Sequence, residues 1–183
     1  MERISAFKTP SNMLALFKIP PYQEIADRSF EDLSLVLDGL QDPGNLGTII
    51  RLADWFGITN IYCSENCVDR YNPKCVQSTM GAIARVKVHY LDLQQLLKEA
   101  VKQNIPVYGT YMNGENLYKT ELSVMALIVM GSEGKGISND LEPFLTKKIS
   151  IPTFPVGNII PESLNVAVSA SIVCAEFRRK AGI

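Results

Sequence analysis

The feature that most constrains the fold is a group of short apolar segments, the clearest of which is Ala126–Met130 (Ala-Leu-Ile-Val-Met). A strand that is apolar on both faces has to be covered on both, as in a parallel sheet that lies between helices. Several further segments are rich in β-branched residues and nearly continuous in their apolar character. We predict six strands in all: Leu33–Leu37, Asn60–Cys63, Arg85–Tyr90, Pro106–Tyr111, Ala126–Met130 and Lys148–Ile151.

Helical patterns alternate with these segments. One apolar stripe with the spacing i, i+3, i+4, i+7 consists of Leu46, Ile49, Ile50 and Ala53. Gly57 follows this stripe as a helix stop. Asp92 is placed to cap a second helix over Leu93–Gln103. The alternation of strands and helices predicts an α/β fold, with a parallel sheet and helices on both of its faces.

The last predicted helix, from about Ser163 to Arg179, is apolar on most of its circumference. One stripe consists of Leu164, Val168, Ile172 and Ala175, and another of Val166, Ala170, Val173 and Phe177. A helix of this kind has to be buried on most sides. It either crosses the core or packs against a second subunit, and we favour a homodimer through this C-terminal helix.

Residues 1–32 differ in character from the rest of the 183-residue chain. Met13–Phe17 could form a strand, but Pro20 and Pro21 then interrupt any ladder or helix. We predict a lead-in or linker segment over residues 1–32 and one domain over residues 33–183. No apolar run approaches the length of about 18 residues that a membrane span needs. The first residues also lack the apolar core of a secretory signal, so we predict a cytoplasmic protein.

Composition limits the partners and cofactors. The net charge of −1 is unlike that of a strongly basic nucleic-acid binder, although a local patch such as Lys147–Lys148 or Arg178–Lys180 can carry binding in a neutral protein. The four cysteines include no C-x-x-C pair, and the only histidine, His89, is remote from them in sequence. Because a zinc site needs about four well-placed ligands, we predict no metal site and reduced thiols.

Polar residues and glycines gather in three blocks, of which the first is Asp38–Arg51. It contains the turn Pro43-Gly44 and then Asn45, which lies where a helix N-cap belongs. On structural grounds alone, Asn45 is a cap and Arg51 pairs with Asp54. Alternatively, Arg51 projects from the edge of the apolar stripe into a cleft at the carboxyl ends of the strands, where ligands usually bind.

The second block, Gly131–Ser138 (Gly-Ser-Glu-Gly-Lys-Gly-Ile-Ser), follows the most apolar strand. Its glycines allow tight turns and close backbone approach to a ligand. It matches neither the phosphate-binding pattern G-x-x-x-x-G-K-[ST] nor the dinucleotide pattern G-x-G-x-x-G. The third block contains Ile151-Pro152 and then Ile159–Val166. There Ser163 is placed to cap the last helix, and Asn165 to be an exposed residue of its first turn.

Taken in order, the blocks resemble the three motifs of the SpoU (TrmH-like) RNA 2′-O-ribose methyltransferases, a branch of the SPOUT class. The matching residues are N-x-G-x-x-x-R over Asn45–Arg51, G-S-E-G-x-G over Gly131–Gly136, and I-P followed by S-L-N-V over Ser163–Val166. Each motif alone is modestly specific, but three in this order and at this spacing are very specific. The resemblance runs from about Leu35 to Phe177. It departs from many members in the longer loop over residues 153–158.

The resemblance implies a deep C-terminal trefoil knot whose loops hold S-adenosylmethionine. On the matching positions, Thr110, Gly131, Ile151 and Leu164 are expected to contact this cofactor, largely through backbone groups. The missing phosphate motifs agree with a ligand that has an adenine and a sulfonium but no phosphate. The implied reaction moves a methyl group to a ribose 2′-hydroxyl of tRNA or rRNA.

The resemblance also assigns Arg51 to the reacting hydroxyl, which it would orient and activate. An arginine acting as the base itself is awkward, since its pKa exceeds about 12. The surroundings are expected to consist of Asn45, Glu133, Ser163 and Asn165, with Glu133 paired to Arg51. The alternatives are a non-catalytic RNA-binding relative that kept the fold, and a nucleotide-binding enzyme, against which the missing phosphate fingerprints argue. The identity of the RNA stays open, as does the presence of a further RNA-binding domain in a longer protein.

Overall fold

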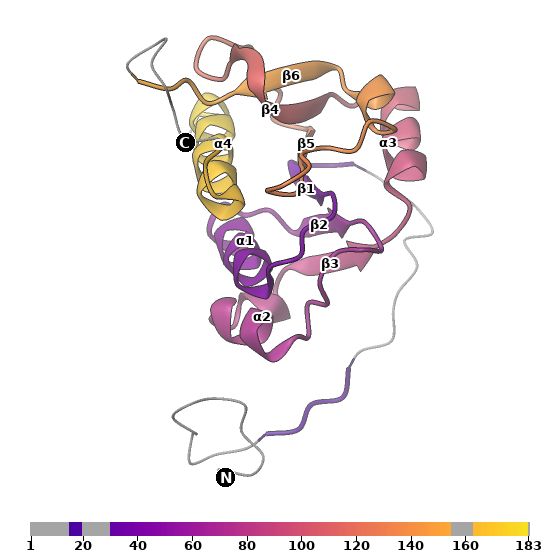
Figure 1. Ribbon diagram of the computed structural model, residues 1–183, viewed down its shortest axis with the longest axis vertical. Coiled ribbons are helices and arrows are strands. Elements are labelled where there is room, and N and C mark those ends of the chain that lie inside the picture. Colours follow the sequence, from indigo (N-terminus) through magenta and orange to yellow (C-terminus); the bar gives the residue numbers. More distant parts are fainter. Residues whose placement is uncertain (1–14, 20–29, 155–162, 183) are drawn as a thin grey trace.

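Six short strands form one sheet in the part of the chain that the structure, a computed structural model, describes: residues 15–19, 30–154 and 163–182 (Figure 1). The strands are β1 (Ser34–Leu37), β2 (Asn60–Cys63), β3 (Lys87–Tyr90), β4 (Val107–Asn116), β5 (Leu127–Met130) and β6 (Lys147–Ser150). Neighbours pair in parallel in the order β3-β2-β1-β5-β4-β6. The predicted parallel sheet is confirmed, and each predicted strand overlaps an observed one.

The strand order changes direction beside β1. The chain runs from β1 outward to β2 and β3, and the later strands lie on the other side of β1. In open α/β sheets, ligands bind outside the carboxyl ends of the strands at such a point. Leu37 on β1 is in register with Met130 on β5. The residues that follow them, Asp38 and Gly131, therefore leave the sheet side by side and bring the first two sequence blocks together.

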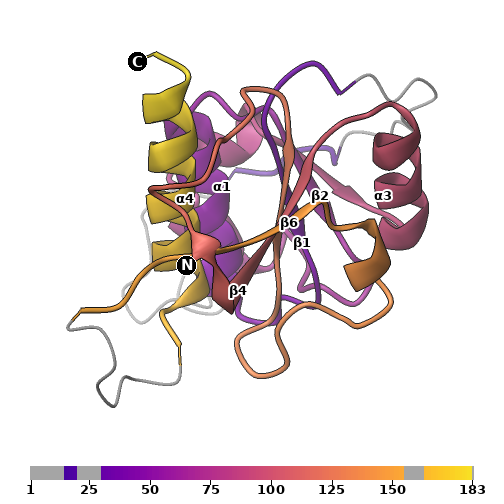
Figure 2. The same ribbon diagram turned by 90° about the horizontal axis from the view of Figure 1, so that it is seen from above.

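Helices cover both faces of the sheet (Figure 2). On one face lie α1 (Pro43–Trp55) and α4 (Val166–Lys180), and α2 (Pro73–Ser78) packs against α1. On the other face lies α3 (Leu93–Lys102). The two helical layers bury separate apolar clusters against the sheet, and the predicted stripe of α1 is fully buried in the larger of them.

The local signals for helix ends are confirmed at α1 and α3. Gly57 has φ +64° just after the end of α1, a conformation that glycine adopts without the usual steric cost. The carboxylate of Asp92 accepts hydrogen bonds from the backbone N–H groups of Gln94 (2.8 Å) and Gln95 (3.2 Å). Asp92 therefore caps α3 as predicted.

Four details differ from the sequence predictions. Helix α2 and the 3₁₀ turns Ala82–Ala84 and Glu142–Phe144 were not expected, because segments this short carry no periodic pattern. Strand β4 continues to Asn116, with its register to β6 shifted between Thr110 and Glu115. The last helix begins at Val166 and not at Ser163. No regular structure is present at residues 15–17 of the strand predicted over Met13–Phe17, whose first two residues lie outside the described part.

Two further expectations concern the whole chain. Among the described residues, no helix has the length and apolar character that a bilayer crossing requires. The C-terminal knot depends on the path of residues 155–162, which lie outside the described residues. The knot therefore stays a prediction.

Candidate functional site

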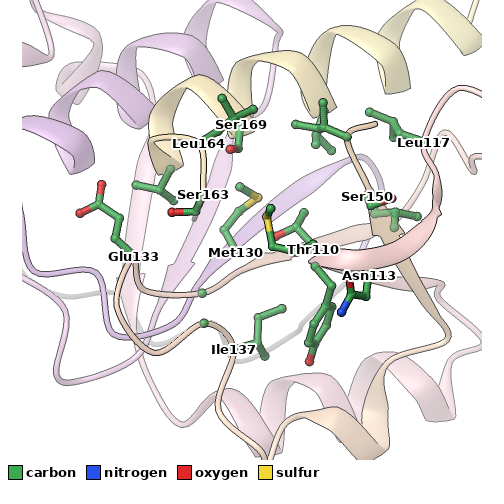
Figure 3. Close-up of a pocket in the computed structure, with 18 of the residues that line it drawn as sticks. Thr110, Asn113, Leu117, Met130, Glu133, Ile137, Ser150, Ser163, Leu164 and Ser169 are labelled. Carbon is green, nitrogen blue, oxygen red and sulfur yellow. The ribbon is translucent and has the colours of Figure 1, made fainter. Parts of the chain in front are cut away.

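A cavity of about 720 Å³ opens at the carboxyl ends of β4 and β5, between the glycine-rich loop, β6 and the start of α4. Figure 3 shows Thr110 and Met130 beside it, with Glu133 and Ser163 at one end and Leu117 and Ser150 at the other. The four residues predicted to contact a cofactor all line this cavity: Thr110, Gly131, Ile151 and Leu164. Two of the predicted catalytic residues, Glu133 and Ser163, line it as well.

The glycine-rich loop forms one wall with its backbone. Ser132 and Gly136 exchange backbone hydrogen bonds of 3.1 and 2.8 Å, which fold the loop back on itself. A Cβ atom on Gly131 would lie 2.1 Å from the carbonyl carbon of Gly136, so a residue with a side chain cannot replace it without moving the loop. Glycine at this position therefore lets main-chain groups border the cavity directly.

The opposite wall is the part of β4 where its register to β6 shifts. Tyr111, Met112 and Asn113 lie in this bulge and line the cavity. Gly114 makes the bulge possible, because a Cβ atom there would lie 2.5 Å from the carbonyl carbon of Ile149. The sequence predictions do not include this wall, although Gly114 in an otherwise strand-like segment is a signal for it, since an isolated glycine in a strand often marks a bulge.

The hydroxyl of Tyr111 is fixed beside the cavity. It donates a hydrogen bond of 2.9 Å to Oε1 of Glu142, which also pairs with Nζ of Lys148 at 3.2 Å. Nζ of Lys148 lies 4.5 Å from the centre of the Tyr111 ring. Burial, together with the hydrogen bond to Glu142, raises the pKa of Tyr111 to about 12. This phenol therefore stays protonated at neutral pH and acts as a donor and a rigid wall.

At the cavity's edge, three of the predicted catalytic residues come together from three separate elements. Nδ2 of Asn45 on α1 donates to Oε1 of Glu133 at 2.6 Å. Nδ2 of Asn165 donates to the same oxygen at 3.2 Å and to Oδ1 of Asn45 at 3.0 Å. The three sequence blocks thus converge on one hydrogen-bonded cluster, which we call the Asn45–Glu133–Asn165 cluster. Ser163 also lines the cavity but, within the described part of the chain, takes no part in these hydrogen bonds.

Asn45 and Asn165 are oriented by helix caps, though not as predicted. Asp42 is the N-cap of α1 and accepts from the backbone N–H of Asn45 at 2.8 Å, so the Asn45 side chain is available to reach Glu133. Pro43 at the first helical position was the signal for this cap. Asn165, and not Ser163, caps α4, with its Oδ1 accepting from the N–H groups of Ala167 and Val168. One carboxamide therefore starts the helix through its oxygen and joins the cluster through its nitrogen.

Arg51 is exposed on α1, six residues after Asn45, and neither predicted ion pair forms. Glu133 accepts from the two asparagines, and Asp54 is held by Arg85 through N–O distances of 2.6–3.1 Å. Among the residues that the structure describes, Arg51 has no hydrogen-bond or ion-pair partner. The other described arginines all have partners: Arg70 the carbonyl of Val88, Arg85 Asp54, Arg178 Asp32, and Arg179 Glu176. The Arg51 guanidinium is therefore available to a ligand.

Within the described part of the chain, no group of three or more histidine, cysteine, aspartate or glutamate side chains is arranged to hold a metal ion. All four cysteines are buried and free. His89 lies on β3, stacked on the ring of Tyr62 with 5.4 Å between the ring centres, and does not line the cavity. The polar side chains that line the cavity include the Glu133 carboxylate and the hydroxyls of Thr110 and Ser163, and the Arg51 guanidinium lies outside this lining, exposed on α1.

Comparison with known proteins links this geometry to one family. The family model described as the SpoU rRNA Methylase family matches residues 32–175. Among curated proteins, the chain is 35% identical over 150 residues to the 23S rRNA (guanosine-2′-O-)-methyltransferase RlmB of Neisseria meningitidis serogroup B. This match covers 81% of the chain and 58% of that enzyme. The first curated relatives are matched over 53%, 68% and 58% of their own lengths.

Solved structures give the same picture. A structure assigned to the TrmH family of RNA methyltransferases, from Porphyromonas gingivalis, is 42% identical with a TM-score of 0.87, covering 98% of this chain and 70% of that one. An AdoMet-bound rRNA methyltransferase from Sinorhizobium meliloti is 25% identical with a TM-score of 0.69, covering 82% and 57% of the two chains.

Proposed function

Because the chain belongs to the SpoU rRNA methylase family, we propose that it transfers a methyl group from S-adenosylmethionine to a ribose 2′-hydroxyl of tRNA or rRNA. The observation that carries this proposal is the contact between the cavity and the Asn45–Glu133–Asn165 cluster, which joins the three motif blocks at one place. The Neisseria relative is named for methylation of a guanosine 2′-oxygen, and the Sinorhizobium structure for its bound AdoMet. Both names support the proposed reaction.

The cavity's chemistry fits the proposed cofactor. Its walls consist of main-chain groups at Gly131 and Ile151 and apolar side chains such as Ile137, Ile149 and Leu164. Sites for small cofactors are usually apolar with a few placed polar groups, as here. Thr110, Gly131, Ile151 and Leu164 would hold the adenosine and methionine parts, neither of which carries a phosphate. When bound, S-adenosylmethionine supplies a methyl group on a cationic sulfur, ready for attack by an oxygen nucleophile.

In the proposed reaction, Arg51 is the residue that acts on the ribose hydroxyl. The 2′-oxygen would bond to the methyl carbon as the carbon–sulfur bond breaks, the sulfur would keep that electron pair and leave as a neutral thioether, and the hydroxyl proton would pass to water. A guanidinium remains charged, so Arg51 would orient the hydroxyl and stabilise negative charge that develops on its oxygen. The partnerless state of Arg51 among the described residues supports this assignment. Asn45, Glu133, Ser163 and Asn165 would shape the acceptor side of the site.

The sharpest test of this function is an Arg51→Ala variant assayed for methyl transfer to total RNA, followed by mapping of the 2′-O-methylated sites. We expect the rate to fall by about 10²- to 10⁴-fold with the cofactor affinity unchanged, since Arg51 does not line the cavity. Arg85→Ala is the matched control, because Arg85 is also exposed near α1 but is paired with Asp54. An Arg51→Ala enzyme that methylated its RNA at nearly the wild-type rate would refute the assignment. If calorimetry showed that the wild-type protein does not bind S-adenosylmethionine, the non-catalytic RNA-binding alternative would replace it.

We further propose that the chain acts as a homodimer through α4. The stripe Val166, Ala170, Val173 and Phe177 is buried in the chain's own core. Of the other stripe, Val168 is 49% exposed, Leu164 is 48% exposed beside the cavity just before α4, and Ile172 is partly buried against the core. On the neighbouring helix α1, Trp55 is 85% exposed. Exposed apolar side chains on these two neighbouring helices support an interaction surface there.

The dimer is tested by placing a charge on this face. Val168→Glu is expected to convert a dimer to monomer in sedimentation at micromolar concentration, because a buried charge without a partner is costly. Val101→Glu on α3 is the matched control, since Val101 is 43% exposed on the opposite side of the sheet. A wild-type chain that sediments as a monomer would contradict the proposal.

The remaining assignments concern organisation and place of action. We propose that residues 1–32 form a lead-in segment to a catalytic domain over residues 33–183. At their junction, Asp32 pairs with Arg178 of α4 at 3.0 Å. We also propose that the protein acts in the cytoplasm, where tRNA and rRNA are found. Because the net charge of the chain is −1, RNA binding would depend on local cations such as Arg51 and the exposed Lys135. A dimer would present two copies of each of these cations.

A further inference from the structure

Asp38, the first residue after β1, is a buried carboxylate without a cation. Its exposure is 7%, and among the described residues it forms no ion pair. The other buried carboxylate in the described part, Glu176, is held by Nε and Nη2 of Arg179, each at 2.7 Å. Because an ionised carboxylate is costly to remove from water, the burial of Asp38 calls for a compensating interaction.

That interaction is made with the glycine-rich loop. Oδ2 of Asp38 accepts a hydrogen bond of 2.7 Å from the backbone N–H of Ser138, which is 100 residues away in sequence. The backbone N–H of Asp38 donates to the carbonyl of Met130 at 2.9 Å, at the point where the loop leaves β5. Asp38 thus holds both ends of the loop, its start through the main chain and its end through the side chain.

Between these two ends lie the groups that border the cavity. Gly131 presents its backbone there, and Glu133 meets Asn45 and Asn165. The loop's other backbone link, between Ser132 and Gly136, is internal to the loop and does not fix it to the sheet. At its Ser138 end the loop is held to the sheet by the buried side chain of Ile137 and by the hydrogen bond from the Ser138 N–H to the Asp38 carboxylate, which is the polar anchor.

We propose that Asp38 is a positioning residue for the cofactor: its carboxylate holds the glycine-rich loop in place as a wall of the cavity through the Ser138 N–H. This inference rests on the proposed function, since it takes the cavity to hold S-adenosylmethionine. Asp38 does not line the cavity, so it acts on the cofactor through the loop. A charge-assisted hydrogen bond to a backbone N–H is among the stronger ones, which suits it to this task.

The test separates positioning from a direct effect of charge. S-adenosylmethionine carries a cationic sulfonium, whereas S-adenosylhomocysteine is neutral at sulfur and otherwise has the same shape without the methyl group. In calorimetry with both ligands, Asp38→Ala is expected to weaken each by about ten-fold, because the loop is released from both. Asp38→Asn, whose amide oxygen still accepts from Ser138, is expected to weaken each by about three-fold or less. Amide exchange at Ser138 should be faster in both variants.

Asp92→Ala is the matched control, because Asp92 is an aspartate that also accepts backbone N–H groups but lies at the start of α3. It should bind both ligands with wild-type affinity. Unchanged affinity of Asp38→Ala, or a loss confined to S-adenosylmethionine in either variant, would overturn the positioning role. If Asp38→Ala does not fold, Asp38→Asn still serves as the test. It shows whether affinity falls equally for the two ligands or only for the cationic S-adenosylmethionine. A wild-type protein that bound neither ligand would instead remove the proposed function itself.

Discussion

The two faces of the sheet are covered by helices of different character. On one face, α3 buries Leu93, Leu96, Leu97 and Ala100 and turns mostly polar side chains to solvent. On the other face, α1 and α4 also bury their inward sides, but they turn Arg51, Trp55 and Val168 outward. The same sheet therefore supports a helix whose sequence is explained by folding alone and two helices whose outward residues are not.

The N-caps of α3 and α4 show the same contrast at the level of one side chain. The carboxylate of Asp92 accepts hydrogen bonds from the first turn of its own helix α3, from the N–H groups of Gln94 and Gln95. Asn165 of α4 caps its helix and also donates to Asn45 and Glu133. An aspartate would cap α4 equally well but has no N–H to donate. The choice of asparagine at this cap is therefore explained by the site and not by the helix.

The largest expected effect comes from separating the two roles of Asn165. In Asn165→Ser the hydroxyl still caps α4, so the free energy of unfolding should change by no more than about 0.5 kcal/mol. The donated hydrogen bonds to Asn45 and Glu133 are lost, and methyl transfer should fall by about 10³-fold, which corresponds to about 4 kcal/mol of transition-state stabilisation. Steady-state kinetics and urea unfolding measure the two quantities. Wild-type activity in a stable Asn165→Ser protein would show that the cluster is only structural.

On the α3 face, a substitution should lower the stability of the protein and leave its activity unchanged. Leu97 is fully buried there, and Leu97→Ala removes apolar contacts and leaves a cavity, at a cost of about 3 kcal/mol in the free energy of unfolding. The residues of the site lie on other elements, so the folded protein should keep its cofactor affinity and its rate per folded molecule. Urea unfolding gives the first value, and calorimetry well below the unfolding temperature gives the second. Loss of cofactor affinity in the folded variant would show that the α3 face contributes to the site as well as to stability.

The same distinction explains what the sequence could predict. Buried positions follow from periodicity, which is why the six strands and the stripe of α1 were found to within a few residues. The cap assignments at Asn45 and Ser163 were wrong because several neighbouring residues can cap a helix, and only the backbone path decides which one does. The partners of Glu133 could not be predicted, because they are distant in sequence: Asn45 is 88 positions away from Glu133, and Asn165 is 32 positions away. The motif resemblance selected the right elements without giving their hydrogen bonds.

A smaller effect is expected from pH, and it arises on the α3 face. His89 is buried against Tyr62, and burial lowers its pKa from 6.5 to about 4, with Arg70 and Lys87 adding to the shift. The unfolded chain binds the proton first, so stability is fully present above pH 6.5 and is lost as the pH falls toward 4. Between pH 7.5 and 5 this amounts to about 2 kcal/mol. His89→Gln should remove that part of the pH dependence of urea unfolding; an unchanged slope would mean that His89 is accessible to protons in the folded state.

The smallest expected effect is the loss of the cap of α3. Asp92→Ala leaves the N–H groups of Gln94 and Gln95 without their acceptor, and the free energy of unfolding should fall by about 1 kcal/mol. Methyl transfer should be unchanged, because no residue of the cavity or of the Asn45–Glu133–Asn165 cluster belongs to α3. Asp92→Ser, which restores an acceptor, should recover most of the stability. If activity fell in Asp92→Ala and stayed low in Asp92→Ser, α3 would take part in the site. The two faces of the sheet would then both contribute to function.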